Sequence, residues 1–86
     1  MYFAYILYSP SHQRPNTGQT DDVSKRLKRH NAGVVMATKA YVPWELVACE
    51  EFETRAGAMR RERWLKSGVG RGFVKQLIEE HKKRNG

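Results

Sequence analysis

The feature that most constrains the fold of this chain is a nearly unbroken apolar run close to its start, YFAYILYS at residues 2–9. A strand with one solvent-exposed face alternates apolar and polar residues, whereas a strand covered on both faces has a continuous apolar sequence. The run therefore predicts a strand that is covered on both sides. A chain of 86 residues predicts one small domain, expected over 1–86.

Turn and cap signals divide the rest of the chain into further elements. Prolines, asparagines and glycines bound the expected strands, and capping side chains and glycines bound the expected helices. After the first strand we expect a turn over 10–18, a short strand near 16–19, a helix over about 22–31, a loop over 33–44, a strand over 44–52, and helices over 55–66 and 71–83. This β-β-α-β-α-α order predicts an α/β (α+β) domain, a small three-stranded antiparallel sheet flanked by helices.

Particular residues set the expected helix ends. Thr20 or Asp21 is expected to cap the first helix, with acidic residues in its first turn, and Asn31-Ala32-Gly33 to stop it. Thr54 is expected to cap the second helix. The stretch SGVGRG at 67–72 follows a helix and lacks the Gly-Lys-Ser/Thr ending of a phosphate loop. It therefore predicts a helix stop and a tight turn.

Charge and cysteine content narrow the classes of function. Sixteen Lys and Arg against nine Asp and Glu give a net charge of +7, which points to nucleic acid or to an anionic membrane surface. The expected basic helices lack a broad apolar face, which disfavours the membrane. The single Cys49 excludes an internal disulfide and a cysteine-based zinc site, so we expect a reducing cytoplasm. The segment MYFAYILYS is too short and lacks the basic flank of a signal peptide or membrane span.

The expected first helix brings an arginine and a histidine to one side. Val23 and Leu27 define its apolar stripe, and at 100° per residue His30 lies about 20° and Arg26 about 60° from Val23. Arg26 could then clamp a phosphate and His30 could transfer a proton. A boundary histidine that only packs is the other interpretation. Three basic residues point further outward, Lys25, Lys28 and Arg29.

A carboxylate and a tyrosine are further candidates. Glu62 lies about 40° from Ala58, on the core-facing side of the expected second helix. Such a carboxylate either pairs with an arginine or binds a hard divalent cation. On the first strand, Tyr5 faces the side opposite to Tyr2 and Tyr8. Packing is the favoured interpretation for Tyr2 and Tyr8, whereas a phenol beside cations could instead accept a proton, because positive charge lowers its pKa.

Three stretches together resemble a known family: FAYILYS, TGQTDDVSKRLKRHNAG and PWELVACEEFETRAGAMRRERWLKSG. The run Thr-x-Asp-hydrophobic-x-x-Arg-Leu-x-x-His-Asn-x-Gly ends at Gly33, and Arg-x-x-Ala-x-x-Arg-Glu-x-x-Leu-Lys ends at Lys66. In order and spacing they resemble the GIY-YIG nuclease superfamily in its small single-domain form, related to the N-terminal nuclease domain of the excision-repair subunit UvrC. The resemblance covers the chain to about residue 75.

The resemblance implies a catalytic cleft and its chemistry. By position the cleft would hold Tyr5, Arg26, His30 and Glu62, with one divalent cation (Mg or Mn) on Glu62. A phenolate or imidazole would take a proton from the attacking water, and Arg26 would balance charge on the phosphoryl oxygens. The second motif, normally Tyr-Ile-Gly, reads Asn16-Thr17-Gly18 here. Asn16 can hydrogen-bond a water or a phosphate but cannot act as a base.

The resulting functional expectation is a metal-dependent DNA endonuclease, acting in repair or recombination on branched or damaged DNA. The alternative is a nucleic-acid-binding module that keeps the cleft without turnover, which the asparagine at position 16 favours. The expected nucleic-acid contacts are Lys25, Lys28, Arg29, Lys39 and Arg71.

Overall fold

The computed structural model describes residues 1–85, in which three strands form one antiparallel sheet in the order β2-β1-β3. The elements are β1 (Tyr2–Ser9), β2 (Arg14–Thr20), α1 (Val23–Asn31), a short 3₁₀ helix (Lys39–Tyr41), β3 (Glu45–Phe52), α2 (Arg55–Leu65) and α3 (Gly68–Asn85). The predicted class and the order β-β-α-β-α-α are confirmed. The last residue of the expected 1–86 domain, Gly86, lies outside the described residues.

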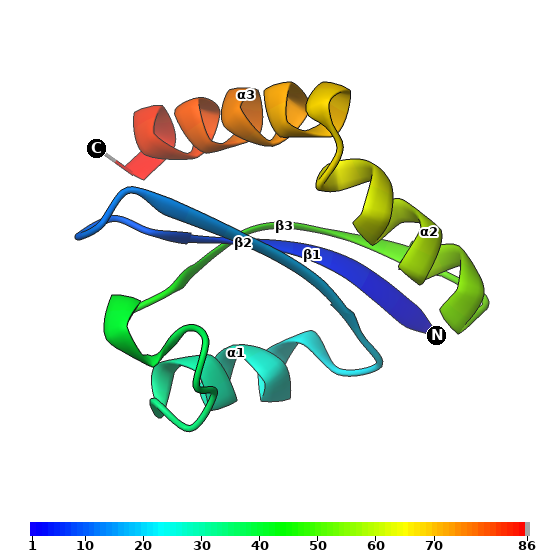
Figure 1. The fold of residues 1–86 in the computed structure, drawn as a ribbon, viewed down its shortest axis with the longest axis horizontal. Helices are drawn as coiled ribbons and strands as arrows, with labels where there is room; N and C mark the ends of the chain where they lie inside the picture. The colour runs from blue at the N-terminus through cyan, green and yellow to red at the C-terminus, as the bar shows by residue number, and fades with distance from the viewer. Residues whose placement is uncertain (86) are drawn as a thin grey trace.

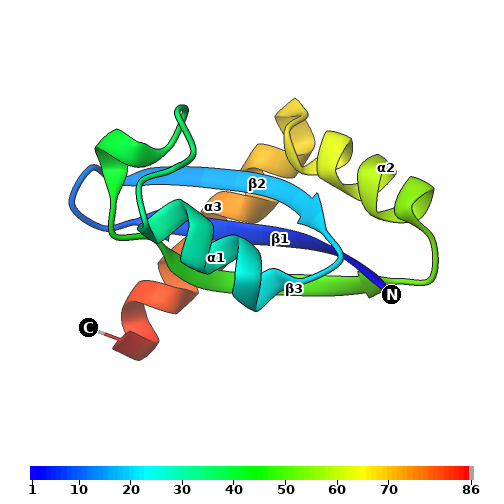
Figure 2. The same ribbon diagram turned by 90° about the horizontal axis from the view of Figure 1, so that it is seen from below.

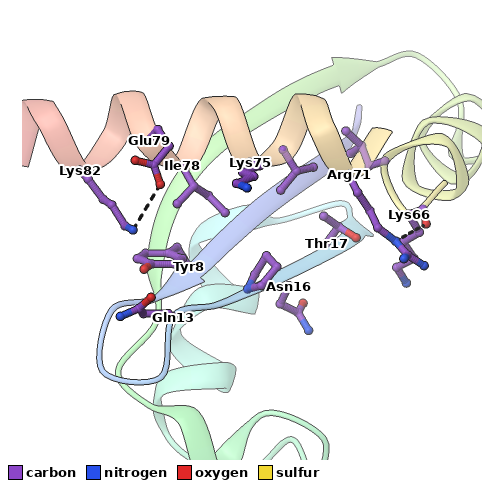
Figure 3. Close-up of a pocket in the computed structure, with 13 residues that line it drawn as sticks. Tyr8, Gln13, Asn16, Thr17, Lys66, Arg71, Lys75, Ile78, Glu79 and Lys82 are labelled. Atoms are coloured by element: carbon purple, nitrogen blue, oxygen red, sulfur yellow. Dashed lines mark hydrogen bonds and ion pairs between the residues drawn. The ribbon is translucent and has the colours of Figure 1, made fainter. Parts of the chain in front are cut away.

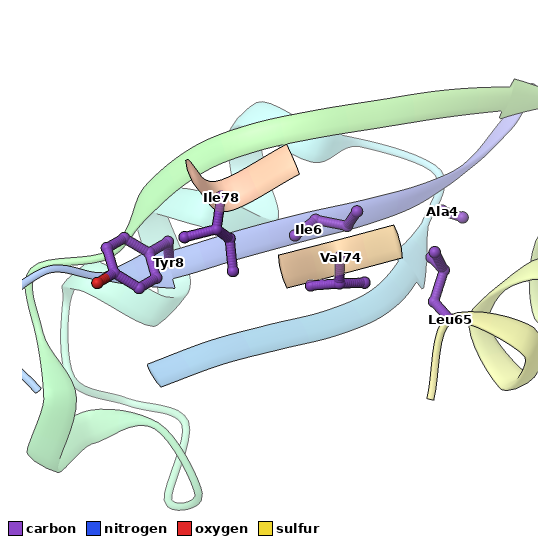
Figure 4. Close-up of a cluster of buried hydrophobic side chains, with 6 residues drawn as sticks. All are labelled: Ala4, Ile6, Tyr8, Leu65, Val74 and Ile78. Atoms are coloured by element: carbon purple, nitrogen blue, oxygen red, sulfur yellow. The ribbon is translucent and has the colours of Figure 1, made fainter. Parts of the chain in front are cut away.

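Helices and loops cover both faces of the sheet, as the apolar first strand requires (Figures 1 and 2). Even-numbered residues of β1 face α2 and α3 and form the larger apolar cluster with them, consisting of Ala4, Ile6, Tyr8, Leu65, Val74 and Ile78 (Figure 4). Odd-numbered residues face α1 and the loop after it, where Tyr5 and Leu7 pack with Trp44. The period of two along a strand thus gives β1 two separate buried surfaces.

The start of β2 and the N-cap of α1 differ from those expected. Strand β2 begins at Arg14, so the turn is shorter than residues 10–18. Pro15 is accommodated because β2 is an edge strand, where one side of the backbone makes no ladder hydrogen bonds. The N-cap of α1 is Asp22, whose side chain accepts from the Lys25 N–H at 3.0 Å. Neither Thr20 nor Asp21 fills that role, and no acidic residue remains in the first turn of α1.

The helix stop predicted at residues 67–72 is confirmed, since α2 ends at Leu65, but the tight turn is wrong beyond Ser67, because α3 begins at Gly68. The Ser67 hydroxyl accepts from the Gly70 N–H at 3.2 Å and so caps the helix. A Cβ at Gly70 would lie 2.7 Å from the Leu65 Cα, and even closer to the Trp64 carbonyl oxygen. The glycine therefore permits α3 to pack closely on the end of α2. The cap at Thr54 is confirmed, with its hydroxyl accepting from the Gly57 N–H at 3.1 Å.

Candidate active site

A buried tyrosine–histidine pair lies where β1 meets the last turn of α1. The Tyr5 hydroxyl is 3.3 Å from His30 Nε2, and both residues are 3% exposed. His30 is the fully buried residue of α1, while Val23 and Leu27 are only half-buried. The buried side of α1 is therefore centred nearer His30 than Val23 and Leu27.

A glycine on the neighbouring strand leaves room for the phenol. Gly18 is paired with Tyr5 across the β1–β2 ladder, and a Cβ at Gly18 would come within 2.6 Å of Tyr5 Cζ. Asn16 pairs with Leu7, so it belongs to the same face of the sheet as Tyr5. Its side chain accordingly points away from α3 (Figure 3). The last glycine of the second motif thus has a steric reason, which the motif itself did not reveal.

Thr38 provides a second hydrogen bond to the His30 ring. It is 2% exposed, and its hydroxyl oxygen lies 2.7 Å from His30 Nδ1. The same hydroxyl also lies 3.5 Å from the Val35 carbonyl oxygen. Each ring nitrogen of His30 therefore faces one hydroxyl, and the neutral imidazole donates to one of them and accepts from the other. No sequence pattern pointed to Thr38, because it lies in an irregular loop without a periodic pattern.

Asn31 and Trp44 hold that loop against the sheet. The Asn31 amide donates to the Trp44 carbonyl oxygen at 3.0 Å and accepts from the Trp44 N–H. The Trp44 indole N–H donates to the Thr38 carbonyl oxygen at 3.1 Å. Asn31 and Gly33, whose φ is 74°, stop the helix as expected. Asn31 has the additional effect of positioning Thr38 through Trp44.

Burial controls the protonation of the pair. It raises the pKa of the Tyr5 phenol, an effect that the charge and hydrogen bonding of Arg26 oppose and the Glu62 carboxylate reinforces. Burial also lowers the pKa of His30, assisted by the positive charges of Arg26 and Arg29. Arg26 acts on the phenol pKa in the expected direction, but desolvation is the stronger effect, so the net shift is upward. At neutral pH the site holds a neutral phenol and a neutral imidazole.

Glu62 reaches the same region from α2. Its side chain is 24% exposed, and one carboxylate oxygen accepts from Lys66 Nζ at 2.8 Å. The ion-pair interpretation is correct in kind, but the partner is a lysine of the same helix rather than an arginine. Glu62 still lies close enough to the Tyr5 phenol to raise its pKa.

The donor set is compatible with one hard divalent cation held together with a substrate. Within residues 1–85, no group of three or more His, Cys, Asp and Glu side chains is arranged to hold a metal ion. Mg²⁺ commonly keeps several waters and binds proteins through one or two carboxylates plus phosphate oxygens of the substrate. A lone, partly exposed Glu62 carboxylate fits that kind of coordination.

The expected nucleic-acid contacts do not form one surface. Lys25, Lys28 and Arg29 are exposed on α1, and Lys39 is exposed on the 3₁₀ helix beyond it. Arg71 lies on α3, across the sheet from α1 (Figure 1), and its Nε donates to the Lys66 carbonyl oxygen at 3.1 Å. In the described part of the chain, no helix has the length and apolar character needed to cross a membrane.

The β2-β1-β3 sheet thus carries the Tyr5–His30 pair on one face, with Arg26 and Glu62 close enough to act on the phenol. The family model of the GIY-YIG catalytic domain matches residues 1–85, and the chain belongs to the GIY-YIG family of nucleases. The predicted family is thereby confirmed.

Several relatives are similar over most of their length. A UPF0213 protein of Haloquadratum walsbyi is 39% identical over 80 residues, covering 92% of this chain and 88% of that protein. The UPF0213 protein YsiG of Lactococcus lactis is 39% identical over 79 residues, covering 91% and 75%. The solution NMR structure of a UPF0213 protein from Bacillus halodurans is 32% identical, with a TM-score of 0.52 and coverage of 90% of this chain and 85% of that one.

Proposed function

We propose that the protein is a metal-dependent DNA endonuclease that hydrolyses phosphodiester bonds, serving DNA repair or recombination in the cytoplasm. The observation that carries the proposal is the hydrogen bond between the Tyr5 phenol and the neutral His30 imidazole, in a chain of the GIY-YIG family. A neutral imidazole with a free lone pair is a proton acceptor at physiological pH.

In this mechanism the phenol relays one proton. The Tyr5 oxygen accepts a proton from the attacking water while its own proton passes to His30 Nε2. The resulting imidazolium keeps its Nδ1–H bond to Thr38. Arg26 balances the charge that develops on the phosphoryl oxygens. Asn16, on the same face of the sheet, hydrogen-bonds the water or the phosphate.

Glu62 would hold the divalent cation, Mg²⁺ or Mn²⁺. When bound, the cation polarises the phosphate and stabilises the leaving oxygen. The chain's own contribution is the carboxylate, held on α2 beside Lys66.

The test is a cleavage screen on plasmid and branched DNA with Mg²⁺ or Mn²⁺. We expect divalent-dependent nicking by the wild-type protein, which Glu62→Gln abolishes and Tyr5→Phe lowers by about 10²–10⁴-fold. The matched control is Glu80→Gln, which removes the same charge from an exposed position of α3 and should leave nicking unchanged. Full nicking by Glu62→Gln would contradict the proposal.

The second candidate function is a nucleic-acid-binding module without turnover. Two observations favour it: Asn16 stands in place of the second-motif tyrosine, and Glu62 is already paired with Lys66. DNA binding by a folded protein that nicks none of these substrates with either cation would select this function.

A further inference from the structure

A basic groove lies on the face of the sheet opposite to the Tyr5–His30 pair, between α3 and the β1–β2 hairpin (Figure 3). Its volume is about 660 Å³. Its apolar floor consists of the exposed edges of three core side chains, Tyr8, Val74 and Ile78, which are 4%, 4% and 6% exposed. The cations along its rim are Lys66, Arg71, Lys75 and Lys82.

Two of these four cations lack a compensating carboxylate. Lys66 pairs with Glu62, and Lys82 pairs with Glu79 at 3.4 Å while lying over the Tyr8 ring. Within residues 1–85, Arg71 and Lys75 form no ion pair. The groove therefore offers two uncompensated positive charges above an apolar floor, which suits an anionic ligand with an apolar or aromatic part.

The size and lining favour an unpaired nucleic-acid strand over a duplex. The volume falls within the range of about 300–1,000 Å³ that holds small ligands, which is room for single nucleotides. A duplex presents phosphates to a protein surface but keeps its base faces stacked, so it would leave the apolar floor without a partner. An unpaired strand can lay its phosphates along cations and turn a base onto apolar and aromatic side chains.

Lys66 connects this groove with the candidate active site. Lys66 lines the groove, where its carbonyl oxygen accepts from Arg71, and its Nζ contacts Glu62, the carboxylate expected to hold the cation. A strand that follows the rim from Lys75 past Arg71 therefore arrives beside Glu62.

We propose that this groove binds a single-stranded segment of nucleic acid, with phosphates at Arg71 and Lys75 and a base over Tyr8 and Ile78. The inference rests on the proposed nuclease function and names its substrate class, DNA with an unpaired strand next to the cleavage point. Flaps, overhangs and frayed branches have this property, and a continuous duplex does not.

The test measures binding of a labelled 12-nucleotide single strand and of the matching duplex by fluorescence anisotropy, without divalent cations so that nothing is cleaved. The groove variant is Arg71→Gln with Lys75→Gln. The matched control is Lys83→Gln with Arg84→Gln, which removes the same charge from exposed positions of α3 outside the groove. Thermal unfolding checks that both variants are folded.

We expect the wild type to bind the strand more tightly than the duplex, and the groove variant to lose at least about tenfold more strand affinity than the control. For the groove variant, the slope of log affinity against log salt concentration should also become shallower by about 1.4, since each phosphate contact on a single strand contributes about 0.7. Equal losses in the two variants, or equal binding of strand and duplex, would overturn the inference. Because no cleavage is involved, such a failure leaves the nuclease proposal intact. Conversely, a protein that binds the strand as expected but shows no divalent-dependent nicking would contradict only the nuclease proposal.

Discussion

At the scale of single residues, the candidate site depends on three small contacts around one phenol. Gly18 leaves the space that the Tyr5 ring occupies, His30 is hydrogen-bonded to the phenol, and Thr38 is hydrogen-bonded to the other ring nitrogen of His30. Together these contacts hold the phenol and the imidazole in place before any substrate arrives. Preorganisation of this kind avoids rearrangement during the reaction.

The depressed pKa of His30 predicts how stability depends on pH. The folded protein binds a proton at His30 less readily than the unfolded chain, whose histidine has the ordinary pKa of 6.5. The free energy of unfolding should therefore be constant above that pH and decrease as the pH falls below it. Urea unfolding at pH 7.5 and 5.5 measures this loss, which should shrink in His30→Gln and persist in the exposed control His12→Gln. An undiminished loss in His30→Gln would contradict the assignment.

The asparagine of the second motif predicts a gain of activity. Asn16 lies on the Tyr5 face of β2, and only a tyrosine there could lose a proton when cations surround it. Asn16→Tyr should raise the cleavage rate by about 10²–10⁴-fold without altering DNA affinity. Adding Glu62→Ala to the same background should abolish the gain. If the wild type already cuts rapidly and Asn16→Tyr changes nothing, the Tyr5–His30 relay is sufficient without a second phenol.

At the scale of elements, the joint between α2 and α3 depends on one glycine out of three. Gly70 packs against the backbone of Trp64 and Leu65, whereas a Cβ at Gly68 or Gly72 would meet no atom within 4 Å. The three glycines look alike in the sequence but have different surroundings.

This difference predicts opposite effects of the same substitution. Gly72→Ala should stabilise the protein by about 0.5–1 kcal/mol, because alanine has the higher helix propensity and the position is open. Gly70→Ala should destabilise it by about 1–3 kcal/mol or more, because α3 has to move away from α2. Urea unfolding of the two variants is the measurement. Similar stability changes in both would contradict this packing.

Sequence patterns were sufficient for elements whose signal is local. The apolar run of β1, the cap at Thr54 and the stop at Gly33 each lie within a few residues of the feature they define. The start of α3 was missed because the role of Gly70 comes from a contact with another helix. The start of β2 was missed because Pro15 reads as a turn unless its strand is known to lie at the sheet edge.

The candidate site shows the same limit. Family resemblance and helical spacing selected Tyr5, Arg26, His30 and Glu62, but neither could give the sign of the tyrosine pKa shift, which depends on burial. Thr38 and the groove along α3 were missed because each arises from segments that are distant in sequence.

At the scale of the whole molecule, the net charge of +7 is distributed over both sides of the sheet. One group of exposed cations lies on α1, and another lines the groove beside α3. DNA bound to one group alone would therefore leave the other exposed to solvent.

This distribution predicts that DNA affinity falls steeply with salt. Contact with about four phosphates of a duplex gives a log–log slope near −3.6, so a fourfold rise in salt weakens binding by about 100-fold. Lys25→Gln with Lys28→Gln should make the slope shallower by about 1.8, whereas Gln76→Ala, an exposed uncharged position on α3, should leave it unchanged. Anisotropy titrations at salt concentrations from about 50 to about 200 mM measure this slope. Affinity independent of salt would contradict an electrostatic mode of binding.

The two buried surfaces of β1 serve different requirements of the protein. Ala4, Ile6 and Tyr8 pack against α2 and α3, and Tyr5 and Leu7 face the side that carries His30. Both sets are buried, so a substitution in either one should lower stability, but only a substitution on the His30 side also changes the surroundings of the candidate site. A one-residue slip of β1 against β2 and β3 would exchange the two sets, so both requirements would fail together.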